Sequence, residues 1–170
     1  MNSDSSQVLI SEWTPKNSGG CHLVIEEKKK NKDEDSNMKT ISWYDNPKFH
    51  LWFDSKVKIP ELEFEVVISR LDNIWQKVIA NGIVNAMMGM YLFKYDKEKW
   101  KDYPINLNEV NFNPKNEISF SYKFSNIDPR GFLLIPATYG SGFIGPFSIM
   151  VKCREKFFLE PFGQKAKTYD

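Results

Sequence analysis

Cysteine and histidine are scarce in this sequence, which contains two of each among 170 residues. So small a set offers neither a zinc-binding spacing nor a framework of disulfide bonds. A cysteine peptidase needs a thiol, an imidazole and an orienting side chain in one cleft. Cys21 and His22 are adjacent instead, and neighbouring side chains of an extended segment point to opposite faces. The sequence therefore predicts no catalytic residue and no enzyme activity for this chain.

Long apolar runs and an excess of charge of either sign are also lacking. No apolar run approaches the roughly 20 residues that a membrane-spanning helix needs, so we expect no transmembrane segment. The formal net charge of +1 gives no electrostatic reason to expect nucleic acid as a partner. Because the N-terminus shows no secretory signal, we expect free thiols and a cytoplasmic location.

Aromatic side chains, in contrast, are abundant: the chain has 13 Phe, 7 Tyr and 5 Trp. Such rings pack well on pleated, half-buried surfaces. Residues 62–69 and 118–124 alternate between apolar and polar side chains, as half-buried strands do. An apolar run at 131–139, a glycine-rich turn and an alternating run at 147–153 predict a β-hairpin. Together these patterns predict an all-β fold, an antiparallel β-sandwich of about eight strands.

The chain divides into one domain with a short polar segment at each end. Residues 1–6 are expected to form a flexible lead, residues 7–162 a single domain, and residues 163–170 a polar tail. The almost purely charged stretch at 26–39 is expected to be an insertion outside the core. The first strand is expected at residues 7–13, with Val8, Ile10 and Trp13 facing the core.

Two groups of short motifs, one near each end of the chain, occur in an order that resembles a known family. The opening group is a tryptophan, a Gly-Gly-Cys turn, and an Asn-Pro step followed by an aromatic residue. The closing group is a Pro-x-Thr step after an apolar run, and then Gly-x-Phe at the start of an alternating strand. This arrangement is similar to the C2-like domain of calpains, the β-sandwich that follows their protease core. The residues that carry the resemblance are Trp13, Gly19, Gly20, Cys21, Asn46, Pro47, Phe49, Pro136, Thr138, Gly145 and Phe147.

The resemblance implies a regulatory or scaffolding domain, the one known as calpain domain III. Its partner would be a calpain protease core in cis, and the parent protein would be a calcium-dependent cysteine endopeptidase or a calpain-like protein. The Cys-Trp, Gly-His and Asn-Pro-Trp steps of the family's peptidase core do not occur in this sequence. The long acidic loop that calpains carry after their Asn-Pro-aromatic motif corresponds here to residues 54–61, which are only mildly acidic. This departure argues against a calcium-responsive loop.

Calcium is the one cofactor that the sequence leaves open, because it needs several converging oxygen ligands. Acidic side chains gather in the charged insertion and again in the loop at 95–103. Lysines interleave the first group and would compete with a cation, so we favour solvated charge there. The candidate ligands are Asp33, Glu34, Asp35, Asp96, Glu98 and Asp102.

Basic residues beside aromatic ones in the second loop predict a surface that could touch anionic phospholipid. The candidates are Lys94, Lys97, Lys99, Trp100 and Lys101. The alternative is that the rings belong to core strands while the lysines keep a strand edge soluble. We favour this alternative.

Three functions are compatible with the sequence. The main hypothesis is a non-catalytic C2-like module that packs on a calpain-type protease core and contacts phospholipid. A second is a free-standing peripheral membrane module that binds calcium and phospholipid. A third is a protein-interaction β-sandwich that offers an open sheet edge to a peptide.

Overall fold

The structure is a computed structural model that describes residues 4–14, 46–71, 76–79, 82–85, 87–96, 99–100, 112, 115–138 and 145–162. These residues form eleven β-strands and no helix. The predicted insertion at 26–39 and the tail at 163–170 lie outside them. The strands are β1 Ser5–Trp13, β2 Phe49–Phe53, β3 Ile59–Arg70, β4 Gln76–Ile79, β5 Gly82–Asn85, β6 Met88–Asp96, β7 Lys99–Trp100, β8 Glu117–Ile127, β9 Phe132–Thr138, β10 Gly145–Cys153 and β11 Phe157–Pro161.

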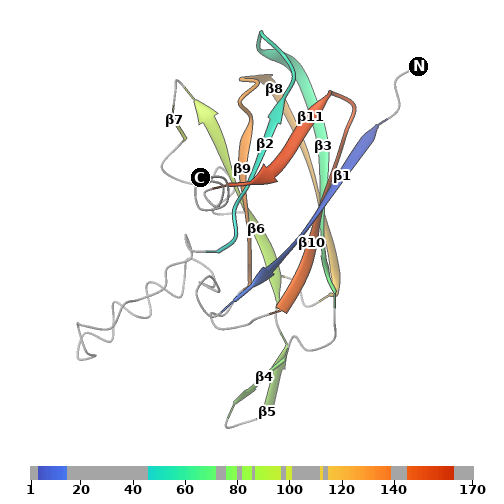
Figure 1. The fold of residues 1–170 in the computed structure, drawn as a ribbon, viewed down its shortest axis with the longest axis vertical. Helices are drawn as coiled ribbons and strands as arrows, with labels where there is room; N and C mark the ends of the chain where they lie inside the picture. Colours follow the sequence, from blue (N-terminus) through green and yellow to red (C-terminus); the bar gives the residue numbers. More distant parts are fainter. Residues whose placement is uncertain are drawn as a thin grey trace, which may run out of the picture.

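Two sheets face each other and form a sandwich (Figure 1). The first, sheet A, has the strand order β1-β10-β3-β8, and the second, sheet B, has the order β11-β2-β9-β6-β7. Every pairing between these strands is antiparallel. The β4–β5 hairpin projects from one end of the sandwich (Figure 1). The predicted antiparallel β-sandwich of about eight strands is confirmed, with four long strands in each layer.

The predicted hairpin between residues 131 and 153 is wrong. Both of its strands exist, as β9 and β10, but β9 pairs with β2 and β6 whereas β10 pairs with β1 and β3. The glycine-rich segment therefore joins the two sheets instead of turning within one. Alternation of side chains identifies a strand and its buried face, but it does not identify the neighbouring strand.

The space between the sheets is filled by one apolar cluster to which both layers contribute. On β3 the predicted alternation is confirmed: Leu62, Phe64, Val66 and Ile68 are buried, while the intervening side chains are exposed or half-buried. Burying one such side chain stabilises the fold by about 1.5–3 kcal/mol. The remaining buried members of the cluster are Trp13, Phe49, Leu51, Phe53, Ile59, Met88, Met90, Leu92, Ile118, Ile127, Phe132, Leu134, Phe147, Ile149, Val151, Cys153, Phe157 and Leu159.

The first strand turns two of the three residues predicted for the core toward solvent. Val8 and Ile10 are 55% and 74% exposed on the outer face of sheet A, whereas Leu9 packs against the core. Trp13 is buried, as predicted. Side chains alternate along a strand, so Trp13 cannot share a face with Val8, which lies an odd number of positions away.

Sheet B is apolar on its outer face as well. All seven residues of β9 are buried. Those that point away from sheet A form a second cluster with two side chains of β6, Tyr91 and Phe93. Phe112 and Phe162 pack against this cluster. The continuous apolar run that the sequence shows at β9 therefore reflects burial on both faces of the strand.

One side of the sandwich is closed by the amide of Gln7, on β1. Its Nε2 donates a hydrogen bond to the carbonyl oxygen of Phe157 at 2.6 Å, and its Oε1 accepts one from the backbone N–H of Leu159 at 3.1 Å. A side-chain amide thus takes the place that a further strand would have beside β11. The backbone N–H and C=O groups at this edge of sheet B are therefore hydrogen-bonded by a side chain of sheet A.

Candidate functional site

Residues from the opening and closing motifs meet inside the sandwich. The indole Nε1 of Trp13 donates a buried hydrogen bond to the Oδ1 of Asn46 at 3.1 Å. The Trp13 ring lies on Phe147, with 4.1 Å between their centroids, and Phe49 meets Phe147 edge-on at 6.2 Å. Gly145 is the register partner of Trp13. Motif residues more than 130 positions apart therefore form one contact group, which we call the signature cluster: Trp13, Asn46, Phe49, Gly145 and Phe147.

Further motif residues have clear packing positions. Pro47 is buried beside the signature cluster, and Pro136 and Thr138 are buried on β9. Proline lacks a backbone N–H and is disfavoured in a central strand. Pro136 is accommodated because β9 pairs with β2 only through residue 134, so only β6 pairs with it at that level. Gly19, Gly20 and Cys21 lie outside the described residues.

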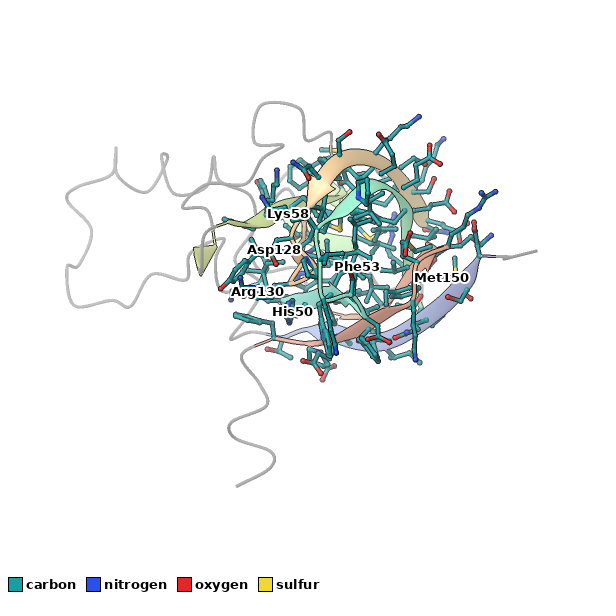
Figure 2. The ribbon with its side chains drawn as sticks, turned by 90° about the horizontal axis from the view of Figure 1, so that it is seen from above. His50, Phe53, Lys58, Asp128, Arg130 and Met150 are labelled. Atoms are coloured by element: carbon teal, nitrogen blue, oxygen red, sulfur yellow. The ribbon has the colours of Figure 1, made fainter. Side chains whose placement is uncertain are left out.

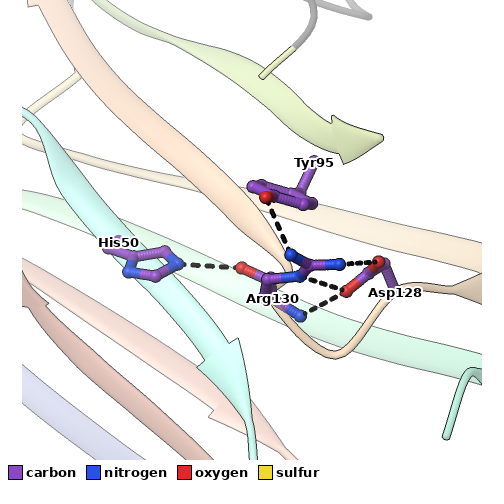
Figure 3. A network of polar contacts seen from close by, with 4 residues as sticks. All are labelled: His50, Tyr95, Asp128 and Arg130. Carbon is purple, nitrogen blue, oxygen red and sulfur yellow. Dashed lines mark hydrogen bonds and ion pairs between the residues drawn. The ribbon is translucent and has the colours of Figure 1, made fainter. Parts of the chain in front are cut away.

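The turn between β8 and β9 carries a polar network with four members (Figure 3). Arg130 makes a forked contact with Asp128, with Nε to Oδ1 and Nη2 to Oδ2 both at 3.2 Å. Its Nη1 donates to the hydroxyl of Tyr95 at 2.9 Å, and the guanidinium carbon lies 4.3 Å from the centroid of that ring. His50 contacts the carbonyl oxygen of Arg130 through Nε2 at 2.8 Å, so this nitrogen carries the proton.

Asp128 is the charged group that the network perturbs. Burial raises the pKa of its carboxyl group, but hydrogen bonds from the side chain and backbone of Arg130, together with nearby positive charge, lower it by more. The charge of Lys58 acts in the same direction as Arg130. The net result is a pKa below the usual value, because these donors favour the carboxylate form.

The same turn is fixed to both neighbouring strands. The N–H of Gly131 donates to the carbonyl of Asp128 at 2.9 Å, which closes the turn, and its φ of 76° lies in the left-handed region. A Cβ at this position would collide with the carbonyl oxygen of Leu51. Only glycine fits without strain. We interpret the network as a clamp that holds the turn, because each of its groups already has a partner within the network.

A partly exposed group of rings lies on the outer face of sheet B. Trp52 stacks on Phe158 with 4.2 Å between ring centroids. The centroid of the His50 ring lies 6.1 Å from the ring centroids of both Trp52 and Phe162. All four side chains are half-buried. The indole N–H of Trp52 is buried and has no hydrogen-bond partner among the described residues. We call this group the aromatic patch: His50, Trp52, Phe158 and Phe162.

The aromatic patch and the outer face of sheet A lie on different sides of the molecule. Seen from above, His50, Asp128 and Arg130 gather on one side and Met150 lies on the other, with Phe53 between them (Figure 2). On the Met150 side, a hollow of about 390 Å³ is lined mainly by charged residues. Two exposed ion pairs cross this region, Lys123 with Glu63 and Arg154 with Asp4. Exposed pairs of this kind contribute little to stability.

The thiol of Cys153 faces the interior. Its Sγ donates to the carbonyl oxygen of Glu63 at 3.3 Å, and burial raises its pKa. A raised pKa keeps a thiol protonated and unreactive. His50, in contrast, lies on the outer face of sheet B. The structure does not bring these two side chains together.

The predicted calcium ligands and lipid-binding residues lie mostly outside the described residues. This holds for Asp33, Glu34, Asp35, Glu98 and Asp102, and for Lys97 and Lys101. Asp96 and Lys99 are register partners where β6 meets β7, and Trp100 pairs with Tyr95. Lys94 is half-buried near the end of β6. Among the described residues, no group of three acidic, cysteine or histidine side chains could hold a metal ion.

The aromatic side chains of β6, the strand that carries Lys94, divide into two kinds. Tyr91 and Phe93 are buried in the second cluster, and Tyr95 is half-buried within the clamp. The buried pair agrees with the core interpretation of those rings. The described residues include no helix with the length and apolarity that a membrane crossing requires.

A scan against models of known protein families finds no match, and a search of curated proteins finds none either. Sequence reasoning missed the aromatic patch and the clamp. The patch could have been found from residues 49–53, where His50 and Trp52 alternate with three apolar residues and must face the other way. The clamp could not, because it joins three segments that are distant in sequence.

Proposed function

We propose that this chain is a non-catalytic β-sandwich module that acts by binding a partner, and that the partner is the protease core of a calpain-type cysteine peptidase in cis. The observation that carries the proposal is the signature cluster. The motifs that resemble the calpain C2-like domain are far apart in the sequence, yet their residues touch. Their contact in one core is what we expect if the motifs belong to a single conserved arrangement.

The surface we assign to the partner is the aromatic patch. Partly exposed aromatic groups are characteristic of protein-binding sites, and tryptophan is frequent among the residues that dominate binding energy. The patch is also firmly held, because His50 is hydrogen-bonded to the carbonyl oxygen of Arg130 and Trp52 is stacked on Phe158. A rigid aromatic surface loses little conformational entropy when it binds.

The non-catalytic part of the proposal is tested with the purified chain and casein as substrate. We expect no hydrolysis in the presence or absence of calcium. Turnover that co-purifies with the chain and disappears in a Cys153→Ala or Cys21→Ala variant would refute it. Turnover that survives both substitutions would indicate a contaminating peptidase.

Co-sedimentation with liposomes separates this proposal from the peripheral membrane module. Vesicles of phosphatidylcholine alone and vesicles containing phosphatidylserine are compared with and without calcium. Binding that requires both calcium and phosphatidylserine would favour the membrane module. Failure to sediment, with no calcium-dependent shift in melting temperature, supports the binding module.

Photo-crosslinking in the native polypeptide tests the assigned surface. A benzophenone amino acid replaces Trp52, and a matched chain carries it at Val57, which is 71% exposed. We expect crosslinks from position 52 to peptides of the protease core and none from position 57. Equal crosslinking from the two positions would remove the aromatic patch from the proposal.

A further inference from the structure

Among the described residues β1 is the outermost strand of sheet A, and it lacks the features that usually protect a strand edge. Its nine residues, SSQVLISEW, include no proline, lysine or arginine. Its register with β10 runs from Ser5 to Trp13 without a bulge. Proteins commonly use lysine, proline or a bulge to keep such an edge from pairing with another chain.

The same strand displays two aliphatic side chains to solvent. Val8 and Ile10 are 55% and 74% exposed on the outer face of sheet A. Val8 lies opposite Met150, which in turn lies opposite Val67, so an apolar row crosses three strands. Met150 and Val67 are half-buried. The row ends at β1, with no further strand beyond it among the described residues.

We propose that β1 pairs with β1 of a second copy of this chain, antiparallel and about a two-fold axis centred on Leu9. In this register Val8 lies opposite Ile10 of the other copy, and Ile10 lies opposite Val8. Cross-strand aliphatic pairs of this kind stabilise antiparallel sheets. Each copy would extend the sheet of the other.

On the inner face the same register places Leu9 opposite its own copy. Leu9 is half-buried in the single chain, so pairing would cover the part that remains exposed. Also on the inner face, Gln7 lies opposite Ser11 of the other copy. On the outer face, Ser6 lies opposite Glu12 of the other copy. No two charges of the same sign lie opposite each other.

The neighbouring registers are less favourable. A register centred on Val8 places Glu12 opposite Asp4, and like charges directly opposite each other destabilise a sheet. A register centred on Ile10 keeps only the pair between the two Ile10 side chains and places each Val8 opposite a charged Glu12. A register in which each residue's partner shifts by one position would place outward side chains of one copy opposite inward side chains of the other. Charge and side-chain pattern therefore select the register centred on Leu9.

Two other edges among the described strands, β11 and β8, are less open to a second copy. β11 is covered by the amide of Gln7, which satisfies two of its backbone groups. β8 carries Lys123 on its outer face, and a lysine on an edge strand disfavours pairing with another chain. The pairing is independent of the function proposed above, because it is selected by residues 4–12, which belong neither to the signature cluster nor to the aromatic patch.

Light scattering after size exclusion tests the proposal on the full chain across a dilution series. We expect a species of twice the chain mass of 19.9 kDa at high concentration. Ile10→Lys should shift it to the single-chain mass, whereas Val57→Lys, at a position that is also more than 70% exposed, should leave it unchanged. A single-chain mass for the wild type at every concentration would overturn the proposal. So would larger open-ended assemblies, because a two-fold contact closes at two copies.

A mixing experiment tests the register. Chains carrying Val8→Cys and chains carrying Ile10→Cys are prepared separately and oxidised either alone or as a mixture. Because Val8 lies opposite Ile10 of the other copy, we expect a disulfide-linked dimer mainly in the mixture. Equal crosslinking of the unmixed variants would contradict the register centred on Leu9.

Discussion

Removing the hydrogen bond between Trp13 and Asn46 tests whether the signature cluster holds the two sheets together. Both side chains are 1% exposed, and the bond is 3.1 Å long. Asn46→Ala leaves the indole N–H buried without this acceptor, which costs about 1–3 kcal/mol. For a chain of this size, that lowers the melting temperature by about 2–12 °C, at about 2–4 °C per kcal/mol. The loss is measurable against a total stability of about 5–15 kcal/mol.

A double-mutant cycle isolates the pair from the other contacts of each residue. Trp13→Phe keeps a ring against Phe147 but removes the donor, so it is the matched partner of Asn46→Ala. Urea unfolding of the wild type, the two single variants and the double variant gives the coupling energy. We expect a coupling of at least about 0.5 kcal/mol, the lower limit for residues in contact. Losses that add to within about 0.3 kcal/mol, as for distant sites, would refute the reasoning.

Three further predictions follow from single residues. Gly131→Ala should destabilise the fold more than Gly89→Ala, by about 1–3 kcal/mol of backbone strain. Gly131 has a φ of 76° and faces a backbone oxygen, whereas Gly89 faces the Phe112 ring. Equal losses of unfolding free energy in urea would contradict this. Asp128 has a lowered pKa, so its contribution is complete above its unfolded pKa of about 3.9 and is lost as pH falls through the lower folded pKa. Asp128→Asn should therefore reduce stability at neutral pH but not at the acidic end of a urea-unfolding series, and a pH-independent difference would count against the clamp. Tyr122→Phe should leave the free energy of unfolding unchanged or raise it by up to about 1 kcal/mol, because the hydroxyl is buried without a partner among the described residues; a clear loss in thermal unfolding would show that it has one.

The class of fold could be predicted from the sequence because local alternation is a direct consequence of strand geometry. Residues 62–69 and 147–153 place their apolar side chains inward as expected. Strand pairing could not be predicted in the same way. β9 and β10 look like a hairpin, and only the three-dimensional structure shows that they belong to different sheets.

The site was predictable only where its residues also carried a recognisable motif. Trp13, Asn46, Phe49 and Phe147 were singled out, and the structure brings them together. The face of β1 was predicted wrongly because apolar character alone does not determine burial in an edge strand. Val8 and Ile10 are aliphatic but face outward, in a strand with one neighbour. Long-range contacts such as that of Gln7 with β11 leave no local trace in the sequence.

The native polypeptide gives the most direct test of the proposed role beside a protease core. Antibodies raised against this chain would be used to isolate the protein from its source cells, and its intact mass and peptides would be measured. The account predicts a polypeptide heavier than 19.9 kDa whose additional peptides form a cysteine-peptidase core continuous with this chain. A native protein of 19.9 kDa with no further peptides would contradict it.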